Sequence, residues 1–578
     1  MAPTDQLQEV KIMLHGTAAS EGIGIGKVML IEEHSLEYTP RTVTDTEAES
    51  QRFKAAVDAF CYNTEKQAEN LRSSAGEKEA EILAGHIQII KDPYLSGEIE
   101  KLIADGQCAE SALEHMCDMF IAMFSAADDE LTKQRAADVR DIKSGVLGIL
   151  LGVNEIKVSD APKGTVLVAR ELTPSVTAGI VKENIAGIIT ETGGTTSHSA
   201  ILARALEIPA VLSVEGVASS LKNGDTVVVD GSEGAVIVNP DDNTVAEYSK
   251  KRDAFLAERK ELENYRGRET KSASGEAYEL FCNIGKPEDA VKAVDADGEG
   301  VGLFRTEFLF MDRTSTPTED EQYEAYKKAA LILKGKSLII RTLDIGGDKD
   351  IPYLGLEKEE NPFMGFRAIR YCLKNRELFK SQIKAILRAS AFGDIKIMFP
   401  LITTMDELRE GKKLVAECKA DLRNMGINFN ENIQVGIMVE TASAAVIADM
   451  LAKEADFFSI GTNDLTGYTM ACDRGNNDVS YLYSPLQPSV LRMIKRTIEC
   501  GVQNGISVGM CGEAAANKLM IPLLISFGLT EFSVSAPSVL NVRKIISTWT
   551  KEEADKVTAK VLEMSTQQEI VEYLKSVV

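Results

Sequence analysis

The sequence from Ser272 to the C-terminus alternates between short apolar runs and longer patterns typical of helices. Such alternation is typical of parallel strands joined by crossover helices. Eight runs fit this pattern, at residues 279–283, 300–305, 337–343, 395–400, 434–440, 457–461, 507–511 and 531–534. Eight such units over about 305 residues favour a (β/α)8 TIM barrel, whose catalytic groups lie at the carboxyl ends of its strands. An open doubly wound sheet is the alternative that the pattern leaves open.

Polar side chains collect at or just after the carboxyl ends of these apolar runs. Chance would place a charge at one or two strand ends, because strands must stop somewhere. The residues concerned here are Asn283, Arg305, Arg341, Glu440, Asn463, Asp464 and Cys511, with Arg474 shortly after Asp464. Since the strand ends of a barrel meet at one face, so many arginines and carboxylates together indicate one polyanionic ligand and a metal ion.

The residue types narrow the chemical identity of this ligand further. Arg305, Arg341 and Arg474 carry planar N–H donors that match phosphate and carboxylate oxygens. Glu440 and Asp464 are hard oxygen ligands, which suit a Mg²⁺ ion that keeps some water and bridges to phosphate. Any one of these residues could instead form an ion pair at the barrel rim.

Two more residues of the C-terminal half are candidates for the same chemistry. Lys349 could add a further cation, and Cys511 is the proton donor that is most easily placed at a strand end. A buried cysteine is by itself usually inert packing, and Cys282 and Cys472 also lie near strand ends or loops. All five histidines lie at or before position 198, so acid–base chemistry in this half must use other groups.

The last of these histidines lies in the loop Gly193-Gly194-Thr195-Thr196-Ser197-His198, between a strand pattern and a helical pattern. The glycines allow a sharp turn, and the Thr/Ser run offers N-cap oxygens. In the first turn of the helix, free N–H groups and the helix dipole favour an anion near His198. Its imidazole could attack a phosphoryl group and hold it covalently, although a lone histidine here is more often only polar surface.

The N-terminal half combines strand patterns with a long helical block. Strand patterns lie at residues 166–169, 185–190, 210–214, 226–230 and 235–238, and short ones occur within 11–32. From about residue 44 to 150, apolar residues recur every three or four positions in charged surroundings, which indicates packed helices. We therefore expect a multidomain α/β protein whose β-rich domain is interrupted by a helical bundle.

The expected domains follow from these patterns. They are an α/β domain that carries the candidate phosphohistidine loop, at 11–42 and 155–242, an inserted helical bundle at 43–154, a linker helix at 243–270 and the barrel at 271–578. The linker segment is rich in Glu, Lys and Arg and has no Gly or Pro before Gly267, so it is semi-rigid and can re-aim the domains that it joins.

The overall composition is that of a soluble cytoplasmic protein. The net charge of −24 disfavours binding to nucleic acid and fits a small basic partner. The nine cysteines form no C-x-x-C pair, so neither a disulfide framework nor a zinc ribbon is indicated. Asp5 and Glu9 precede any apolar run, which argues against a signal peptide, and the longest apolar stretch, near 145–153, is too short to span a membrane.

Several of these segments resemble the phosphoenolpyruvate-utilising enzyme family. The stretch 193–204, Gly-Gly-Thr-Thr-Ser-His-Ser-Ala-Ile-Leu-Ala-Arg, is similar to the phosphohistidine motif of that family. Residues 302–307, 344–349, 461–466 and 509–513 resemble its barrel motifs. The order and length match the members that pass the phosphoryl group to a small carrier protein, in the first step of the bacterial sugar phosphotransferase system. The resemblance runs from about residue 12 to the C-terminus.

The resemblance implies a role for each site residue. His198 would accept the phosphoryl group of phosphoenolpyruvate through Nε2, and Thr177 would orient the phosphohistidine. Cys511 would protonate the enolate to give pyruvate. Phosphoenolpyruvate would be held by Arg305, Arg341, Arg474, Asn463, Asp464 and Lys349, and Mg²⁺ would be bound by Glu440 and Asp464. The helical insertion would dock a histidine-containing phosphocarrier protein, and the barrel would form a homodimer.

Two positions depart from the family pattern. Thr195 stands where the family usually has Arg, and Gly467 stands where Gln is common. The first change removes a cation beside the phosphohistidine, which could alter the rate or the choice of partner. Three alternatives in function are a dikinase or synthase of the same family, a nitrogen-system paralogue and a non-catalytic regulator. The first would need an additional ATP-grasp domain, the second an N-terminal sensor domain, and the third would be expected to lose some of Arg305, Glu440, Asp464 and Cys511.

Overall fold

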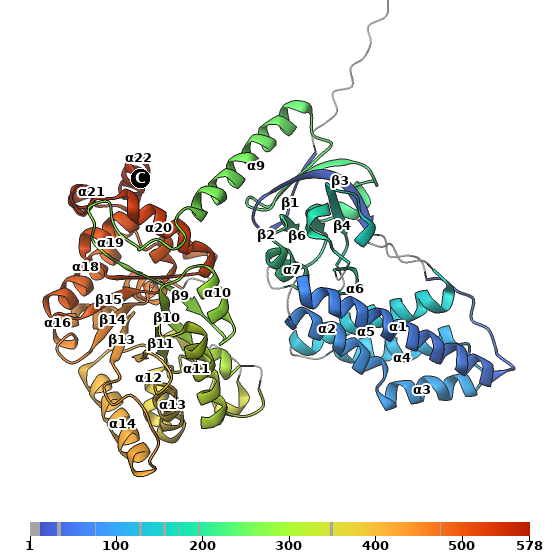
Figure 1. Ribbon diagram of the computed structural model, residues 1–578, viewed down its shortest axis with the longest axis horizontal. Coiled ribbons are helices and arrows are strands. Elements are labelled where there is room, and N and C mark those ends of the chain that lie inside the picture. Colours follow the sequence, from blue (N-terminus) through green and yellow to red (C-terminus); the bar gives the residue numbers. More distant parts are fainter. Residues whose placement is uncertain are drawn as a thin grey trace, which may run out of the picture. The chain divides into compact units, whose positions relative to one another are not determined.

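The computed structural model describes residues 12–31, 36–74, 77–126, 130–153, 158–172, 174–177, 179–194, 197–311, 313–346, 351–473 and 476–578. The chain forms two compact units, Met1–Arg259 and Lys260–Val578 (Figure 1). The helix α9 (Asp242–Glu263) carries the chain from the first unit into the second, where the sequence predicts a linker helix. None of the described helices combines the length and the hydrophobicity that crossing a membrane requires.

The second unit is a closed barrel of eight parallel strands. These are β9 (Glu279–Ile284), β10 (Gly300–Arg305), β11 (Ser337–Arg341), β12 (Ile395–Phe399), β13 (Val435–Val439), β14 (Phe457–Ile460), β15 (Ser507–Met510) and β16 (Glu531–Val534). Each strand pairs with the next in the chain, and β16 pairs with β9, which closes the barrel. The predicted TIM barrel is thereby confirmed, and the open sheet is excluded.

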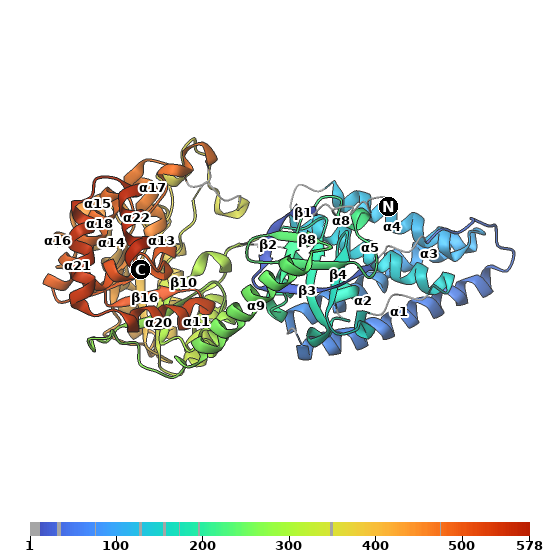
Figure 2. The same cartoon turned by 90° about the horizontal axis from the view of Figure 1, so that it is seen from above.

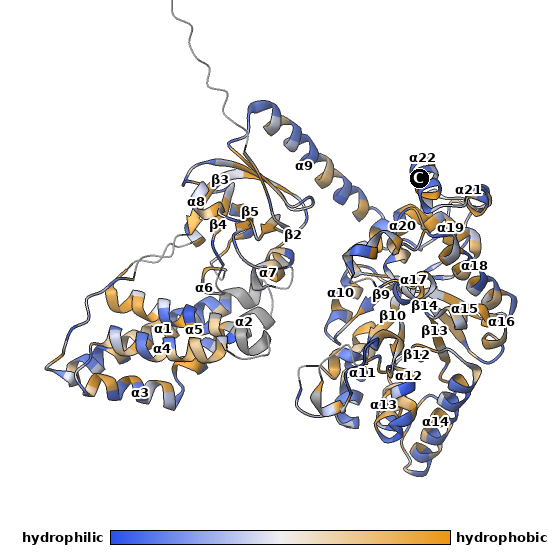
Figure 3. Ribbon diagram, turned by 180° about the vertical axis from the view of Figure 1, so that it is seen from behind, coloured by the Kyte–Doolittle hydropathy of each residue, from blue (hydrophilic) through white to orange (hydrophobic). Residues whose placement is uncertain are grey.

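Helices surround the barrel strands, as Figure 2 shows from above. They are α10 (Asp289–Asp295), α11 (Glu319–Leu333), α12 (Ile369–Lys374), α13 (Arg376–Ala389), α14 (Met405–Asn424), α15 (Ala442–Val446), α16 (Ala448–Leu451), α17 (Thr462–Met470), α18 (Pro488–Gln503), α19 (Ile521–Phe527), α20 (Val539–Thr548), α21 (Lys551–Glu563) and α22 (Gln567–Val577). Amphipathic helices such as α14 carry both hydrophilic and hydrophobic stripes (Figure 3) and bury the apolar one against the strands.

The side chains of the barrel strands divide into two groups, because successive residues of a strand point to opposite faces. One group, which includes Cys282 and Ile340, packs outward against the helices. The other fills the barrel interior with the small cluster of Leu303, Ile339, Met398, Met438, Phe457 and Cys511. Cys511 and Cys282 therefore lie in different environments, although the sequence gives both a place near a strand end.

The first unit contains an eight-stranded mixed sheet. Its strands are β1 (Ile12–His15), β2 (Thr17–Ser20), β3 (Ile23–Ile31), β4 (Thr165–Ala169), β5 (Ile185–Thr190), β6 (Ala210–Leu212), β7 (Thr226–Asp230) and β8 (Ala235–Val238), in the order β1-β8-β7-β3-β4-β5-β6-β2. The strands at the start of the chain thus join those that follow residue 165. The short helices α6 (Pro174–Thr177), α7 (His198–Leu206) and α8 (Val217–Ser220) connect them.

Between β3 and β4, the described residues form five α-helices. They are α1 (Thr46–Ser74), α2 (Glu77–Ile90), α3 (Pro93–Ala104), α4 (Ala109–Ser125) and α5 (Glu130–Leu151). Their apolar faces share a core of their own, with Phe53, Leu113, Ile142 and Val146 among its buried residues. The observed combination of mixed sheet, helical bundle and barrel confirms the predicted fold class; the domain boundaries stay a prediction.

Candidate active site

Three carboxylates meet at the carboxyl end of the barrel. Glu440 directly follows β13, Asp464 lies in the first turn of α17 after β14, and Asp344 lies in the loop after β11. One oxygen from each of the three groups lies within 4.8 Å of the others. Glu440 and Asp464 are the two predicted metal ligands, and the structure brings them together with a third carboxylate.

Two buried arginines neutralise part of this acidic cluster. Arg341, the last residue of β11, places Nη2 2.7 Å from Glu307 Oε1 and Nη1 2.9 Å from Asp344 Oδ2. Arg367 places Nη2 2.8 Å from Asp344 Oδ1 and 3.1 Å from Asp464 Oδ2. The carboxylates and guanidinium groups thus form one continuous charged network.

Burial makes this network electrostatically sensitive. The pKa of Glu440 is raised well above its ordinary value, first because the group is buried and then because Asp464 and Asp344 repel its negative charge. Burial lowers the pKa of Arg341, but the nearby Glu307 and Asp344 outweigh that effect and raise it. The cluster would be stabilised by a further cation beside Glu440, because like charges in a low dielectric repel strongly.

Some polar atoms of the network have unused bonding capacity. Within the part of the chain that the structure describes, Arg341 Nε and Glu307 Oε2 are buried without a hydrogen-bond partner. Buried polar atoms are rarely left so, and in a cleft such atoms indicate a ligand. The donor set for a metal ion is made of carboxylate oxygens only, which fits a hard divalent cation. The arginine donors fit an anionic ligand beside it.

The backbone around the cluster holds it in place. Glu440 Oε1 accepts a hydrogen bond of 2.6 Å from the Leu401 amide, and a Cβ at Gly461 would lie only 2.8 Å from Glu440 Oε2. The glycine of the Gly461–Thr466 motif therefore leaves the space that the carboxylate needs. Thr306 Oγ1 donates to the Arg341 carbonyl at 2.8 Å and ties the ends of β10 and β11 together.

Cys511 lies directly after β15, in the barrel interior near Arg341 and Glu440. Burial raises the pKa of its thiol to about 11, an effect that the Ser459 hydroxyl and Arg341 partly offset. The thiol is therefore protonated at neutral pH and available as a donor. Asn283 Nδ2 donates to the Cys511 carbonyl at 3.0 Å and holds the backbone at this position.

The other predicted barrel residues are distributed as follows. Arg305 ends β10 half-buried, and its charge also lowers the pKa of the Cys511 thiol, so the two groups lie near each other. Asn463 lies beside Asp464 in the first turn of α17, and its carbonyl accepts a hydrogen bond of 2.9 Å from Tyr483 Oη. Lys349 and Arg474 fall outside the described residues.

His198 begins the helix α7 in the first unit. Ser197 is the N-cap, and its Oγ accepts a hydrogen bond of 3.3 Å from the Ala200 amide. Gly193 has a φ of 107°, which a residue with a side chain rarely adopts, and the Ser213 hydroxyl donates to its carbonyl at 2.7 Å. The loop therefore has the predicted turn and cap, whereas Thr195 lies outside the described residues.

Thr177 lies in α6, which packs against α7, the helix of His198. The residue is buried. Ser199, in the first turn of α7, donates to the Leu172 carbonyl at 3.4 Å and so fastens this turn to the loop before α6. The predicted pair of residues thus comes from two helices that are in contact.

Sequence reasoning missed three members of the charged network. Glu307 and Asp344 both lie inside motifs that resemble the family, 302–307 and 344–349, but neither is among the site residues that the sequence predicts. Arg367 belongs to no strand pattern, because it lies in an irregular segment before α12. The charge balance of the site gives a reason to look for a second arginine near a third carboxylate. It does not give the position of that arginine in the sequence.

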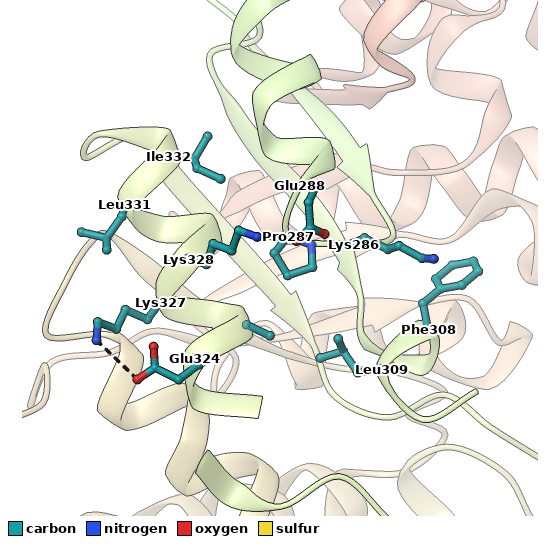
Figure 4. A pocket seen from close by; sticks show the side chains of 11 residues that line it. Lys286, Pro287, Glu288, Phe308, Leu309, Glu324, Lys327, Lys328, Leu331 and Ile332 are labelled. Carbon is teal, nitrogen blue, oxygen red and sulfur yellow. Dashed lines mark hydrogen bonds and ion pairs between the residues drawn. The ribbon is translucent and has the colours of Figure 1, made fainter. Parts of the chain in front are cut away.

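A pocket of about 850 Å³ lies elsewhere on the second unit, between the segment Lys286–Glu288, the turn at Phe308 and Leu309, and α11 (Figure 4). Four of its five charged lining groups are already paired, with Lys328 2.5 Å from Glu288 and Lys327 3.4 Å from Glu324. Its described lining includes none of the predicted site residues. We therefore assign the chemistry to the acidic cluster and not to this pocket.

Comparison with known proteins gives the family of the chain. Family models of PEP-utilising enzymes match three segments: the N-terminal domain at residues 15–135, the mobile domain at 161–234 and the PEP-binding domain at 259–550. A phosphoenolpyruvate-protein phosphotransferase of Bacillus subtilis (strain 168) is 46% identical over 570 residues, which cover 98% of this chain and 99% of that protein. The chain belongs to the phosphoenolpyruvate-protein phosphotransferase family. The resemblance in the sequence motifs and the prediction of an enzyme are thus confirmed.

A second relative of this phosphotransferase is similar over nearly the whole chain, and a solved structure matches part of it. The phosphoenolpyruvate-protein phosphotransferase of Listeria innocua serovar 6a is 45% identical over 563 residues, covering 97% of this chain and 98% of that protein. A solution structure of an Enzyme I protein is 37% identical, covers 42% of this chain and 99% of that chain, and has a TM-score of 0.38. The full-length relatives match both units of this phosphotransferase family member.

Proposed function

We propose that the protein moves the phosphoryl group of phosphoenolpyruvate to its own His198 and then to a histidine of a small phosphocarrier protein, with release of pyruvate. The observation that carries this proposal is the network of Arg341, Arg367 and three carboxylates at the carboxyl end of the barrel. Phosphoenolpyruvate carries both a phosphate and a carboxylate, so it needs several cationic donors in one cleft.

The barrel residues bind and orient the substrate. Arg305, Arg341 and Arg474, with Lys349 and Asn463, hold the oxygens of phosphoenolpyruvate, and the unpartnered Arg341 Nε is one donor that such a ligand would satisfy. Glu440 and Asp464, with Asp344 beside them, would hold a cation, and Mg²⁺ suits three hard carboxylate ligands. When bound, Mg²⁺ neutralises negative charge on the phosphate and on the developing enolate.

Proton transfer completes the first half of the reaction. His198 takes the phosphoryl group, which leaves the enolate of pyruvate in the cleft. The Cys511 thiol then gives its proton to the terminal carbon of the enolate, since burial keeps that thiol protonated at neutral pH. Thr177 supports the phosphohistidine by orienting its imidazole.

The second half of the reaction requires His198 to meet a different partner. One imidazole cannot lie in the barrel cleft and face a carrier protein at the same time, so the β-rich domain must move relative to the barrel. The helix α9 is suited to such movement, and the bundle within residues 43–154 would dock the carrier. We further propose, on the family resemblance alone, that the protein is a cytoplasmic homodimer joined through its barrel.

Replacement of Cys511 by serine tests this mechanism. A serine hydroxyl is a far weaker acid than a thiol, so we expect pyruvate release from phosphoenolpyruvate to slow by about 10²–10⁴-fold. Binding of phosphoenolpyruvate, measured by calorimetry with Mg²⁺ present, should change by less than about twofold because the arginines are intact. Cys282→Ser is the matched control, since Cys282 is equally buried but packs outward among the helices. Unchanged pyruvate release in Cys511→Ser would contradict the donor role.

A further inference from the structure

A second carboxyl group lies inside the barrel, away from the acidic cluster. Glu531 is the first residue of β16, at the amino end of the strand, and is 5% exposed. Among the residues that the structure describes, its Oε1 is fully buried and has no hydrogen-bond partner, so the small exposed surface belongs to the rest of the residue. Such an arrangement is costly unless the carboxyl group has a use.

Two glycines, each from one of the barrel motifs that resemble the family, leave space for this carboxyl group. A Cβ at Gly302 would clash with Glu531 Oε1, and a Cβ at Gly509 would lie 2.8 Å from the same oxygen. Gly302 opens the motif that leads to Arg305, and Gly509 opens the motif that leads to Cys511. The absence of side chains at these positions lets Glu531 reach into the barrel interior at the level of Gly509.

Strand register connects Glu531 to Cys511. Gly509 pairs with Glu531 on one side and with Ser459 on the other, so the three residues lie in one layer of the barrel. Cys511 is two residues further along the chain, directly after β15, and its side chain also lies in the barrel interior, one layer up. Ser459 is 1% exposed, and its Oγ is buried without a well-formed hydrogen bond, although it lies close enough to lower the pKa of the Cys511 thiol.

The charges that face Glu531 come from two other strands. Glu279 of β9 and Lys396 of β12 lie at the same end of the barrel, and Lys396 Nζ is 5.9 Å from the centroid of the Phe457 ring. Burial, reinforced by Glu279 and only partly offset by Lys396, raises the pKa of Glu531 to about 8. At neutral pH the buried group therefore carries a proton.

We propose that Glu531 returns a proton to Cys511 after each turnover, through a bridging water and the Ser459 hydroxyl. The inference rests on the proposed function, because it requires Cys511 to lose its proton to the enolate. Glu531 does not touch the substrate and acts only through Cys511. Glu531 Oε1 and Ser459 Oγ are buried, lack partners and lie on the two strands that flank Gly509, and buried polar atoms of this kind are often bridged by internal water.

Each proton in this sequence has a defined origin and destination. The Cys511 S–H bond breaks as the C–H bond of pyruvate forms, which leaves a thiolate. Ser459 gives its hydroxyl proton to the thiolate and takes one from the water, which takes the proton of Glu531. The Glu531 carboxylate then recovers a proton from solvent at the amino end of the barrel. Only protons move, so no oxidant or reductant is needed.

Isotope exchange in the full-length protein separates this step from the chemistry. With phosphoenolpyruvate, Mg²⁺ and ¹⁴C-pyruvate in D₂O, ¹⁴C entering phosphoenolpyruvate reports phosphoryl transfer and its reversal. Deuterium entering the same molecule at C3 reports exchange of the Cys511 proton with solvent. In Glu531→Gln we expect ¹⁴C exchange to stay within about twofold, and the ratio of deuterium to ¹⁴C exchange to fall by at least about tenfold.

Three further variants test whether the fall in the ratio is specific to the proposed proton path. Ser459→Ala should also lower the ratio of deuterium to ¹⁴C exchange, and Glu531→Asp should keep part of the ratio that Glu531→Gln loses. Glu279→Gln changes the more exposed carboxyl group at the same end of the barrel, and it should leave the ratio within about twofold of the unmodified protein. An unchanged ratio in both Glu531→Gln and Ser459→Ala would overturn the proposal. So would an equal loss of both exchanges, because that outcome indicates a structural role. Absence of ¹⁴C exchange in the unmodified protein would instead contradict the proposed function itself.

Discussion

Arg341→Met should lower pyruvate release from phosphoenolpyruvate by about 10²–10³-fold, the usual effect of removing one preorganised donor from an anion site. Arg341 is 8% exposed and bonds both Glu307 and Asp344. Its loss leaves Glu307 buried without this cation, so we also expect a stability loss of about 3–5 kcal/mol, as for other broken buried pairs. Steady-state pyruvate assays and urea unfolding measure the two effects.

Arg341→Lys is the matched control for charge. Lysine keeps the positive charge but lacks the planar pair of donors that spans Glu307 and Asp344. We expect a smaller loss of stability than in Arg341→Met and a loss of activity between those of the methionine variant and the unmodified protein. A methionine variant that releases pyruvate at the original rate would show that Arg341 has no role in binding the substrate.

Glu440→Gln should lower the catalytic rate without lowering the stability of the metal-free protein. We expect pyruvate release to fall by about 10²–10³-fold and the rise in melting temperature on adding Mg²⁺ to disappear, because one hard ligand is lost. Without Mg²⁺, the variant should be as stable as the unmodified protein or more so at pH 8, because a buried carboxylate no longer has to ionise.

The sign of this effect follows from the raised pKa of Glu440. A carboxyl group whose pKa is raised in the folded state favours folding fully below its ordinary pKa, and that contribution is lost as pH rises through about 8. The difference in unfolding free energy between Glu440→Gln and the unmodified protein should therefore grow in favour of the variant from pH 5 to pH 8. Thermal unfolding in a chelating buffer measures it. A Mg²⁺-dependent rise in melting temperature that survives in the variant would contradict the ligand role.

The barrel could be predicted from the sequence because its strands are buried on both faces. Such strands appear as nearly continuous apolar runs, and β10 and β16 have the predicted bounds. The ends of the others differ by a residue or two, as at β11, where Arg341 ends the strand and Thr342 and Leu343 begin the loop. Helix α9 ends at Glu263, before Gly267, whose φ of 72° is favoured by glycine.

The site could be predicted only in part, for a physical reason. Residues that end or directly follow a strand, such as Arg341 and Glu440, are placed by the strand itself, so the pattern finds them. Arg367 is placed by an irregular loop before α12, next to Ala368 with a φ of 54°, and no periodicity marks such a segment. Glu531 was predicted only as part of a strand, because its role depends on the missing side chains of Gly302 and Gly509.

The central claim is that His198 carries the phosphoryl group, and mapping of a phosphorus label tests it most directly. The full-length protein is incubated with Mg²⁺ and phosphoenolpyruvate labelled in its phosphate, and the labelled peptide is then identified. We expect acid-labile, alkali-stable label on the peptide that contains His198, and none on that peptide in His198→Ala. Label at the same level in His198→Ala would contradict the account.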